Sequence, residues 1–424
     1  MDGPVTGRRT NGTSAHATAF DPTATVVARR DARTIAQSVP RGLRHVLSLN
    51  DFEKAARRFL PRPVFAYVSG GVEDNQSLAD NRAVFHDYSF VPRAFVNIAQ
   101  RSLATTLLGH TYAAPFGIAP FGLCALSAYR GDVVLARTAN DANILMVMSG
   151  SSLIRLEEVA AASNTAWFQA YLPGDMPNIT ALIERVARAG FGTLVITVDV
   201  PISANRENNI RAGFSTPLRP TLRLAWDGLS HPRWLFGTFL RTLVTHGMPH
   251  FENNYATRGA PILSPNVLRD FANRGHLNWE HFALIRKMWK GELVVKGILH
   301  ADDARIARDA GADGVIVSNH GGRQLDGAVS PLRVLPDIVK ACPDLPVMID
   351  SGFRRGTDVL KALALGAKFV FLGRPFNYAA AIAGEAGVRH AIDILRTEIS
   401  RDMALLGVTR IDEIDATRLY RAGK

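Results

Sequence analysis

A histidine followed by two glycines and an arginine is the segment of this sequence best suited to acid–base chemistry. His320 follows the apolar run Gly314–Val317 closely, and Arg323 lies three residues further on. An imidazole can accept a proton near neutral pH, and a guanidinium can hold a carboxylate through two parallel hydrogen bonds. The segment therefore indicates proton abstraction from a substrate that carries an anionic group.

Two further charged residues follow other apolar runs, Asp199 after Leu194–Val198 and Lys296 after Leu293–Val295. A carboxylate beside an imidazole fixes the tautomer of the ring and raises its basicity. A lysine stabilises negative charge that develops during a reaction. We therefore expect Asp199 and Lys296 to act with His320, provided that the ends of these runs meet.

Two neighbouring glycine-rich segments, Asp350–Arg354 and Gly373–Arg374, predict a phosphate site. Glycine lets backbone N–H groups approach a phosphate, and arginine can grip it with two hydrogen bonds. Turn glycines with surface arginines are the alternative interpretation. In barrels of alternating strands and helices, the loops after strands 7 and 8 are the usual phosphate site.

The elements that would position these residues alternate along the chain. Amphipathic segments such as Ile179–Ala189, Ala301–Ala310, Pro331–Cys342 and Thr357–Leu365 separate short apolar runs. The eight runs are Phe116–Ala119, Ile144–Met148, Ala166–Ala170, Leu194–Val198, Leu293–Val295, Gly314–Val317, Val347–Ile349 and Phe369–Leu372. Alternation predicts a parallel sheet, and eight strands predict a closed α/β barrel, the (β/α)8 or TIM barrel. A doubly wound open sheet is the alternative.

Regions outside this alternation complete the predicted organisation. Residues 1–40 lack hydrophobic periodicity and are expected to form a disordered tail before a barrel domain at 41–424. Residues Leu49–Phe59 are expected to form an N-terminal helix capped by Asn50 or Asp51. Over ninety residues separate the fourth and fifth runs, so we expect a functional insertion at about 207–290.

Composition excludes several classes of protein. The 424 residues are 47% hydrophobic and 21% charged, which suits a large core, and no apolar run is long enough for a transmembrane helix. Cys124 and Cys342 cannot form a disulfide framework or a cysteine zinc cluster, so we expect a cytoplasmic protein without a metal. The net charge of +11 comes from scattered arginines, so no nucleic-acid partner is expected.

The run Ser318–Gln324 resembles the active-site signature of the FMN-dependent α-hydroxy-acid dehydrogenase/oxidase family. The resemblance covers roughly residues 45–415 and extends to the other strand ends in order. It implies a (β/α)8 barrel that binds FMN and oxidises an L-2-hydroxy acid, such as lactate or mandelate, to the 2-oxo acid. A phosphate-binding barrel synthase or isomerase, and a flavin-binding protein without turnover, are the rival classes.

The resemblance also implies roles for individual residues. His320 matches the catalytic base, Asp199 its carboxylate partner, and Lys296 a residue beside the flavin. The substrate-side positions are matched by Tyr67, Tyr171, Arg206 and Arg323. The FMN positions are matched by Pro120, Phe121, Gly122, Ser149, Gln169, Thr197, Lys296, Ser318, Asp350, Ser351, Gly352, Arg354, Gly373 and Arg374.

The sequence departs from the family pattern at several of these positions. Phe121 removes a hydroxyl, and Gly122 in place of alanine favours a dehydrogenase over an oxidase. Ser151 stands where many oxidases have tryptophan, which predicts a wider pocket. Arg206 lies in Ala204–Asn209, an altered version of the usual motif. A soluble oxidase that uses O2 and releases H2O2 stays the alternative within the family.

Residues 211–250 mix arginines with large apolar side chains such as Trp226, Trp234 and Phe239. That composition is typical of a segment at a membrane surface, and it resembles the corresponding segment of membrane-associated mandelate and L-lactate dehydrogenases. The resemblance implies peripheral contact with the inner face of a membrane, electron transfer to quinone or another acceptor, and a homotetramer. Packing of Trp234, Phe236 and Phe239 on the barrel or in an oligomer interface is the alternative.

Overall fold

The computed structural model describes residues 39–215, 219, 221–264 and 274–421, and the chain divides into two compact units, 1–41 and 42–424. Of the tail predicted at 1–40, only Val39 and Pro40 fall within the described residues, so its disorder stays a prediction. The fold described below is that of the second unit.

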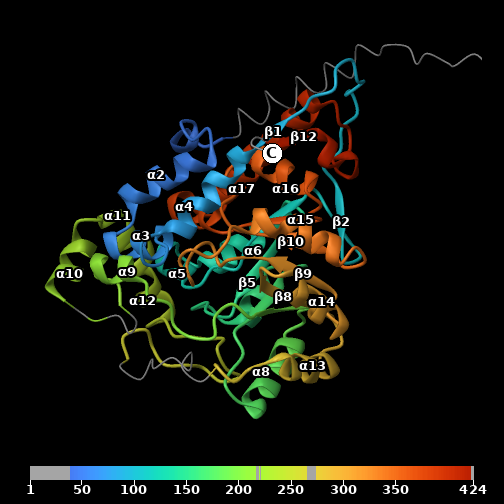
Figure 1. The fold of residues 1–424 in the computed structure, drawn as a ribbon. Helices are drawn as coiled ribbons and strands as arrows, with labels where there is room; N and C mark the ends of the chain where they lie inside the picture. The colour runs from blue at the N-terminus through green and yellow to red at the C-terminus, as the bar shows by residue number, and fades with distance from the viewer. Residues whose placement is uncertain (1–38, 216–218, 220, 265–273, 422–424) are drawn as a thin grey trace, which may run out of the picture. The chain divides into compact units, whose positions relative to one another are not determined.

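Eight parallel strands close into a barrel in the order in which the chain supplies them, and the last pairs with the first. Figure 1 shows strands in the middle of the ribbon with helices around them. They are β4 (Phe116–Ile118), β5 (Leu145–Ser149), β6 (Trp167–Ala170), β7 (Thr193–Thr197), β8 (Glu292–Ile298), β9 (Gly314–Val317), β10 (Val347–Ile349) and β11 (Phe369–Leu372). Every apolar run predicted as a strand is one, so the (β/α)8 barrel is confirmed and the open sheet is excluded.

Helices follow the strands around the barrel. They are α5 (Cys124–Ser127), α6 (Gly131–Asp141), α7 (Leu156–Ala160), α8 (Met176–Arg188), α13 (Trp279–Met288), α14 (Ala301–Asp309), α15 (Pro331–Ala341), α16 (Gly356–Ala364) and α17 (Arg374–Leu406). The backbone of α17 leaves helical geometry at Ala383 and Gly384. The four predicted helices agree with the observed ones to within three residues at each end.

An N-terminal helical extension precedes the barrel, as predicted. It consists of η1 (Arg41–Leu43), α2 (Leu49–Phe59), α3 (Arg62–Ser69), α4 (Gln76–Ala83) and η2 (Val84–Asp87). Helix α2 packs on α17. Its predicted cap was wrong: Ser48 is the N-cap, and Asp51, at the third helical position, accepts a hydrogen bond from the Ser48 backbone at 3.0 Å.

Short strands join the two ends of the unit. Strand β1 (Tyr88–Phe90) pairs antiparallel with β12 (Leu419–Arg421), which follows η5 (Ile411–Glu413) and η6 (Ala416–Arg418). Strands β2 (Thr105–Leu107) and β3 (His110–Tyr112) form a separate hairpin. Leu107 and Tyr112 of this hairpin pack against the buried cluster that fills the barrel.

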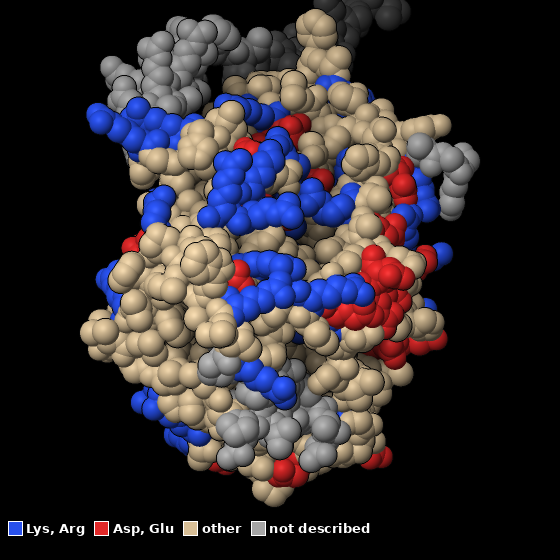
Figure 2. Space-filling view, turned by 90° about the vertical axis from the view of Figure 1, so that its left-hand side faces the viewer, with Lys and Arg blue, Asp and Glu red and all other residues tan. Residues whose placement is uncertain are grey.

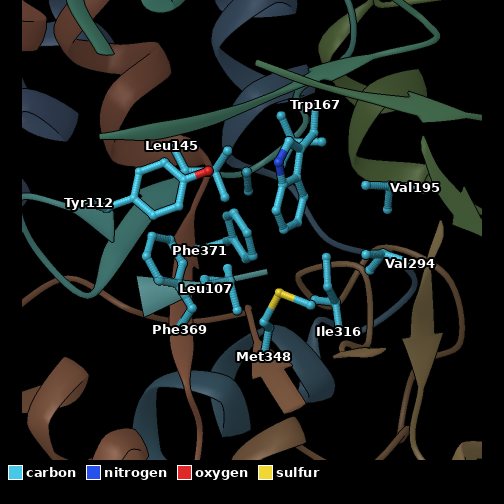
Figure 3. Close-up of a cluster of buried hydrophobic side chains, with 12 residues drawn as sticks. Leu107, Tyr112, Leu145, Trp167, Val195, Val294, Ile316, Met348, Phe369 and Phe371 are labelled. Atoms are coloured by element: carbon cyan, nitrogen blue, oxygen red, sulfur yellow. The ribbon is translucent and has the colours of Figure 1, made fainter. Parts of the chain in front are cut away.

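The interior of the barrel is filled by apolar side chains, which Figure 3 shows in close-up. Leu145 and Val147 come from one strand and Phe369 and Phe371 from another, because alternate strand residues share a face. Several of these residues lie at strand beginnings, beside Tyr112 of the hairpin. This half of the barrel is packed with apolar side chains, and in barrels of this kind the chemistry lies at the opposite ends of the strands.

The segment between β7 and β8 is the predicted insertion. It contains α9 (Glu207–Ala212), α10 (Leu222–Leu229), α11 (Pro232–Trp234), the π-helix η3 (Leu235–Leu240) and α12 (Arg241–His246). Helix α13, which the prediction of 207–290 included, instead contacts the barrel helix α8. The extra structure therefore spans about residues 200–278.

Candidate active site

A cavity of about 160 Å³ opens where the strands end. The predicted site residues that line it are Tyr67, Pro120, Phe121, Gly122, Tyr171, Thr197, Arg206, Lys296, His320, Arg323, Asp350, Ser351, Gly352, Arg354, Gly373 and Arg374. The other predicted residues, Asp199, Ser149, Gln169 and Ser318, do not line the cavity but hydrogen-bond to one another or to residues that do. The tertiary structure thus brings the predicted set together.

His320 stands at the centre of a short chain of hydrogen-bonding groups. Its Nδ1 lies 2.9 Å from Oδ1 of Asp199, and its Nε2 lies 3.3 Å from the hydroxyl of Tyr171. The backbone of His320 is left-handed, with φ of 58°, and its N–H donates to Oγ of Ser318 at 3.0 Å. Left-handed geometry is uncommon for a residue other than glycine, and such strain is typical of functional positions.

Burial and charge set the protonation states of this chain of groups. Burial lowers the pKa of His320 below its ordinary value of 6.5, and Asp199 offsets only part of that effect. Burial would raise the pKa of Asp199, but His320 and Lys296 hold it below its ordinary value. Burial raises the pKa of Tyr171 to about 12, against the opposing charge of Lys296. Near neutral pH the arrangement is an aspartate, a neutral imidazole and a phenol.

Lys296 is a fixed charge at the base of the cavity. Its Nζ lies 3.1 Å from a carboxylate oxygen of Asp350 and donates to Oγ of Ser318 at 2.9 Å. Burial would lower the pKa of Lys296, but Asp350 and Asp199 raise it above its ordinary value. The next residue, Gly297, forms a bulge in β8 with φ of 109°. A Cβ there would come within 2.7 Å of the Asp199 side chain, so the bulge requires glycine.

Arg323 and Arg206 form a cationic wall beside His320. The NH1 group of Arg323 donates to the carbonyls of Tyr67 and Gly70, and its guanidinium lies 5.1 Å from the Tyr67 ring centroid. Burial, together with the nearby charges of Arg206 and Arg374, lowers the pKa of Arg323 to about 9. Buried like charges repel one another, so this wall favours an anionic ligand.

Arg354 has the features of a phosphate ligand. It is buried, its NH1 donates to the carbonyl of Phe353, and its Nε has no hydrogen-bond partner. Burial lowers the pKa of Arg354 to about 10, with help from the charges of Arg82 and Arg374. The neighbouring Gly352 has φ of 89°, and a Cβ would meet the Asn81 carbonyl at 1.9 Å. Only glycine fits there, and the loop can then bring its backbone close to a ligand.

The guanidinium of Arg374 makes three backbone contacts that the sequence did not predict. Its Nε, NH1 and NH2 donate to the backbone carbonyls of Val68, Gly321 and Gly70 at 2.9–3.0 Å. All three nitrogens therefore tie the end of α3 to the loop after β9. A guanidinium has five N–H groups, so two remain after these three bonds, and Arg374 also lines the cavity. Its contact with a phosphate stays a prediction.

Unpartnered buried atoms on adjacent strands fit a flat ligand with hydrogen-bonding edges. Among the described residues, Nε2 of Gln169 and Oγ1 of Thr197 are buried without a hydrogen-bond partner. The Ser149 hydroxyl donates a hydrogen bond to the side-chain oxygen of Gln169 at 3.2 Å, which orients that side chain. Unsatisfied buried polar atoms are costly unless a ligand completes them. Together with Arg354 they suit FMN, whose ring has polar edges and whose tail ends in a phosphate.

Sequence reasoning missed several residues of the cavity. Phe251 and Val200 line it from the insertion. Glu53 of α2 lies 3.8 Å from NH2 of Arg354. These residues belong to no strand-end motif, so only their position in the folded chain identifies them.

A larger cavity of about 770 Å³ lies between the barrel helices α7 and α8 and the insertion. Its arginines are paired: Arg185 contacts Glu157 at 2.8 Å, and Arg258 contacts Glu252 at 2.8 Å. It contains neither the strained histidine nor the unpartnered atoms of the smaller cavity. The smaller cavity is therefore the candidate active site.

Known proteins are similar to this chain in sequence and in fold. The family described as FMN-dependent dehydrogenase matches residues 56–421. The (S)-mandelate dehydrogenase of Pseudomonas putida is 37% identical over 380 residues, which cover 89% of this chain and 95% of that protein. An L-lactate dehydrogenase of Caulobacter sp. (strain K31) is 39% identical over 388 residues, covering 89% of this chain and 100% of that protein.

A solved structure gives the same result for the fold. The crystal structure of the monotopic membrane protein (S)-mandelate dehydrogenase matches with a TM-score of 0.81 and 36% identity. The match covers 89% of this chain and 100% of that one. On the grounds of both sequence and structure, the chain belongs to the family of FMN-dependent dehydrogenases.

Proposed function

We propose that this protein oxidises an L-2-hydroxy acid to the corresponding 2-oxo acid with FMN as cofactor. The observation that carries the proposal is the imidazole of His320, which is hydrogen-bonded to Asp199 and faces the same cavity as Arg323. The named relatives, a mandelate and an L-lactate dehydrogenase, act on acids of this class. Bound FMN would supply the two-electron acceptor.

Each residue contributes a separate part of the reaction. The substrate carboxylate is held by Arg323, with the hydroxyl of Tyr67 and the guanidinium of Arg206 beside it. Asp199 keeps the proton of the imidazole on Nδ1, so the lone pair of Nε2 faces the cavity. The substrate loses two electrons and two protons: Nε2 of His320 accepts one proton, and the two electrons with the other proton would pass to the bound cofactor. Tyr171 stays protonated and can donate a hydrogen bond to the substrate oxygen.

The cofactor contacts follow from the unpartnered groups. Arg354 and the Gly352 backbone would hold the phosphate, while Gln169, Thr197 and Lys296 would face the ring. Lys296 would then lie where negative charge grows as electrons arrive, and its buried pairing with Asp350 keeps it protonated.

Anaerobic mixing of the yellow holoenzyme with a single 2-hydroxy acid tests the function. The proposal expects loss of the oxidised-flavin absorbance with L-lactate or (S)-mandelate, and little change with the opposite enantiomer. A holoenzyme that keeps its oxidised spectrum with every 2-hydroxy acid, while still binding FMN, would be a flavin-binding protein without this activity.

We propose further that the protein associates with a membrane surface through residues 211–250. None of the helices described in 39–215, 221–264 and 274–421 is long and apolar enough to cross a bilayer. On α10, Leu222, Trp226 and Leu229 are 93%, 71% and 64% exposed, and their spacing places them on one face. Figure 2 shows bands of Lys and Arg side chains on the side of the molecule where α10 lies. Apolar anchors near basic residues suit an anionic bilayer.

The packing alternative holds for part of the same segment. Trp234 is buried, and its Nε1 donates to the carbonyl of Leu126 at 2.8 Å. Phe239 stacks on Trp234, whereas Phe236 is exposed. Trp234 and Phe239 thus hold the segment against the barrel. The exposed side chains, Leu222, Trp226, Leu229 and Phe236, would form the membrane face. The expected homotetramer stays a prediction.

The electron acceptor is proposed to be a quinone in the membrane. A soluble oxidase that passes electrons to O2 is the alternative. Stopped-flow reoxidation of the reduced enzyme decides between them: the proposal expects a soluble quinone analogue to restore the oxidised spectrum much faster than air-saturated buffer. Faster reoxidation by oxygen, with H2O2 released, would favour the oxidase.

A further inference from the structure

Residues 249–262, which we call the strap, bring the insertion to the edge of the active-site cavity. The strap is folded back on itself: the Phe251 N–H donates to the carbonyl of Ala260, and the Ile262 N–H donates to that of Pro249. Phe251 lies at its start and lines the cavity. The insertion thereby supplies an aromatic ring to a site that is otherwise built mainly from strand ends and from α3.

The strap is fixed to the barrel by buried polar bonds. Asn253 accepts a hydrogen bond from the Leu156 N–H at 2.9 Å and donates to the carbonyls of Ser152 and Ile154. Arg185 of α8 donates to the carbonyls of Glu252 and Tyr255. Buried side chains that satisfy a loop backbone in this way are costly to remove. The strap is therefore anchored to the barrel at Glu252, Asn253 and Tyr255, directly after Phe251.

A glycine fixes the position of Phe251 itself. The Gly259 N–H donates to the Phe251 carbonyl at 2.9 Å, and a Cβ on Gly259 would come within 2.5 Å of that oxygen. Such a contact would force the two halves of the strap apart. Gly259 therefore sets how far the aromatic ring reaches into the cavity.

The cavity lining divides by chemistry. Arg206, Lys296 and Arg323 supply charge, whereas Phe121, Val200 and Phe251 supply apolar surface. With the carboxylate on Arg323 and the hydroxyl-bearing carbon near His320, the substrate side chain is left with the apolar part. A Cβ at Gly122 would meet the Ser151 Cβ at 3.0 Å and the Tyr67 hydroxyl at 3.3 Å, so glycine keeps room beside that part.

We propose that Phe251, held by the strap, is a specificity-determining residue that selects 2-hydroxy acids with an aromatic side chain over those with a methyl group. The inference rests on the proposed function and names the substrate class for the same site. An aromatic ring gains contact area and ring–ring geometry against Phe251 and Phe121, whereas a methyl group gains little. The strap thus gives the insertion a role in substrate choice that is separate from any contact with a membrane.

The test compares two substrates on the holoenzyme. The ratio of kcat/KM for (S)-mandelate to that for L-lactate is measured in the wild type and in Phe251→Ala. The ratio is expected to fall about tenfold or more, the scale of discrimination by an apolar pocket. In Phe251→Leu, which keeps apolar bulk without the ring, the ratio is expected to lie between those of the wild type and Phe251→Ala. Phe236→Ala, an exposed phenylalanine of the same insertion, is the matched control and should keep the wild-type ratio.

The anchors give a second measurement that does not depend on turnover. Binding of benzoylformate and of pyruvate to the oxidised holoenzyme is followed by the change in flavin absorbance. Asn253→Ala and Gly259→Ala are expected to weaken the binding of benzoylformate severalfold more than the binding of pyruvate, because both substitutions displace the Phe251 ring.

Equal losses for the two ligands in all three variants, Phe251→Ala, Asn253→Ala and Gly259→Ala, would overturn the inference while leaving the proposed function intact. If no 2-hydroxy acid reduces the wild-type flavin, the proposed function itself is wrong and the inference fails with it. A wild-type enzyme that prefers L-lactate, with the preference unchanged in Phe251→Ala, would overturn the inference alone.

Discussion

The mouth of the barrel and the 200–278 insertion hold their functional side chains in different ways. At the mouth, Lys296 lies within β8, Asp199 lies two residues beyond β7, and His320 lies three beyond β9. The ladder of the barrel extends almost to them, because the Val198 N–H donates to the Lys296 carbonyl and the Ser318 N–H donates to the Ile298 carbonyl. Phe251 has no barrel strand beside it in the sequence, and its position depends on Asn253, Arg185 and Gly259.

The difference predicts how each region responds to substitution. A functional side chain at the mouth can be removed while the strand beneath it stays in place, so the loss should be chemical and local. An anchor in the insertion fixes several residues at once, so its loss should move a segment and change ligand choice more than the chemical step. The predictions below test this contrast, beginning with the largest expected effect.

His320→Asn should slow flavin reduction by substrate by about 10²–10⁴-fold, the usual contribution of a general base. FMN should stay bound, because the backbone of β9 does not depend on the imidazole. Stopped-flow absorbance measures the reduction, and the yellow colour after gel filtration reports the cofactor. His86→Asn changes an exposed histidine and serves as the control. Rapid bleaching in His320→Asn would remove this residue from the role of base.

Arg354→Gln should weaken FMN binding by about tenfold to a hundredfold, the loss of a charge-assisted hydrogen bond of about 1.5–3 kcal/mol. Fluorescence quenching during titration of the apoprotein measures this affinity. Riboflavin, which lacks the phosphate, should bind both proteins alike. Arg355→Gln, an exposed neighbour paired with Glu398, is the control. An unchanged FMN affinity would place the phosphate elsewhere.

The pH profile of kcat/KM should have an acid limb set by His320. Burial lowers its pKa below 6.5, so activity is expected to be full above that pKa and to fall as the pH drops through it and the imidazole becomes protonated. Asp199 raises the pKa of His320, so Asp199→Asn should move the limb to lower pH. It should also lower the plateau, because the tautomer is no longer fixed. An acid limb that stays at the same pH in Asp199→Asn would show that Asp199 does not raise the pKa of His320.

Trp226→Ser should weaken membrane association severalfold, since a side chain at the bilayer surface is only partly buried and gains a fraction of the about 1.5–3 kcal/mol of full burial. Sedimentation with vesicles containing anionic lipid measures binding, and turnover with a soluble acceptor should stay at the wild-type rate. Leu405→Ser removes an exposed apolar side chain of α17 and should have no effect on sedimentation. Equal loss in both variants would argue against a specific membrane face on α10.

The fold and most of the site could be predicted because their signals are local. Each barrel strand is a short apolar run, and the residues that follow it carry the chemistry, as with Asp199 and His320. The cap of α2 was assigned to Asn50 or Asp51 rather than Ser48, since neighbouring polar residues compete for that position. The use of Arg374 could not be predicted, because its three carbonyl partners come from α3 and the loop after β9.

The sequence by itself determined the barrel, the order of its strands and the family, because apolar periodicity and the Ser318–Gln324 motif are properties of contiguous residues. Only the tertiary structure decided that Arg374 ties loops together, that Trp234 faces inward while Trp226 faces out, and that Phe251 reaches the cavity. The direction of those side chains is set by partners more than a hundred residues away or by a folded-back loop, and residue type does not encode it. The contacts proposed to set substrate specificity therefore form only when the chain has folded.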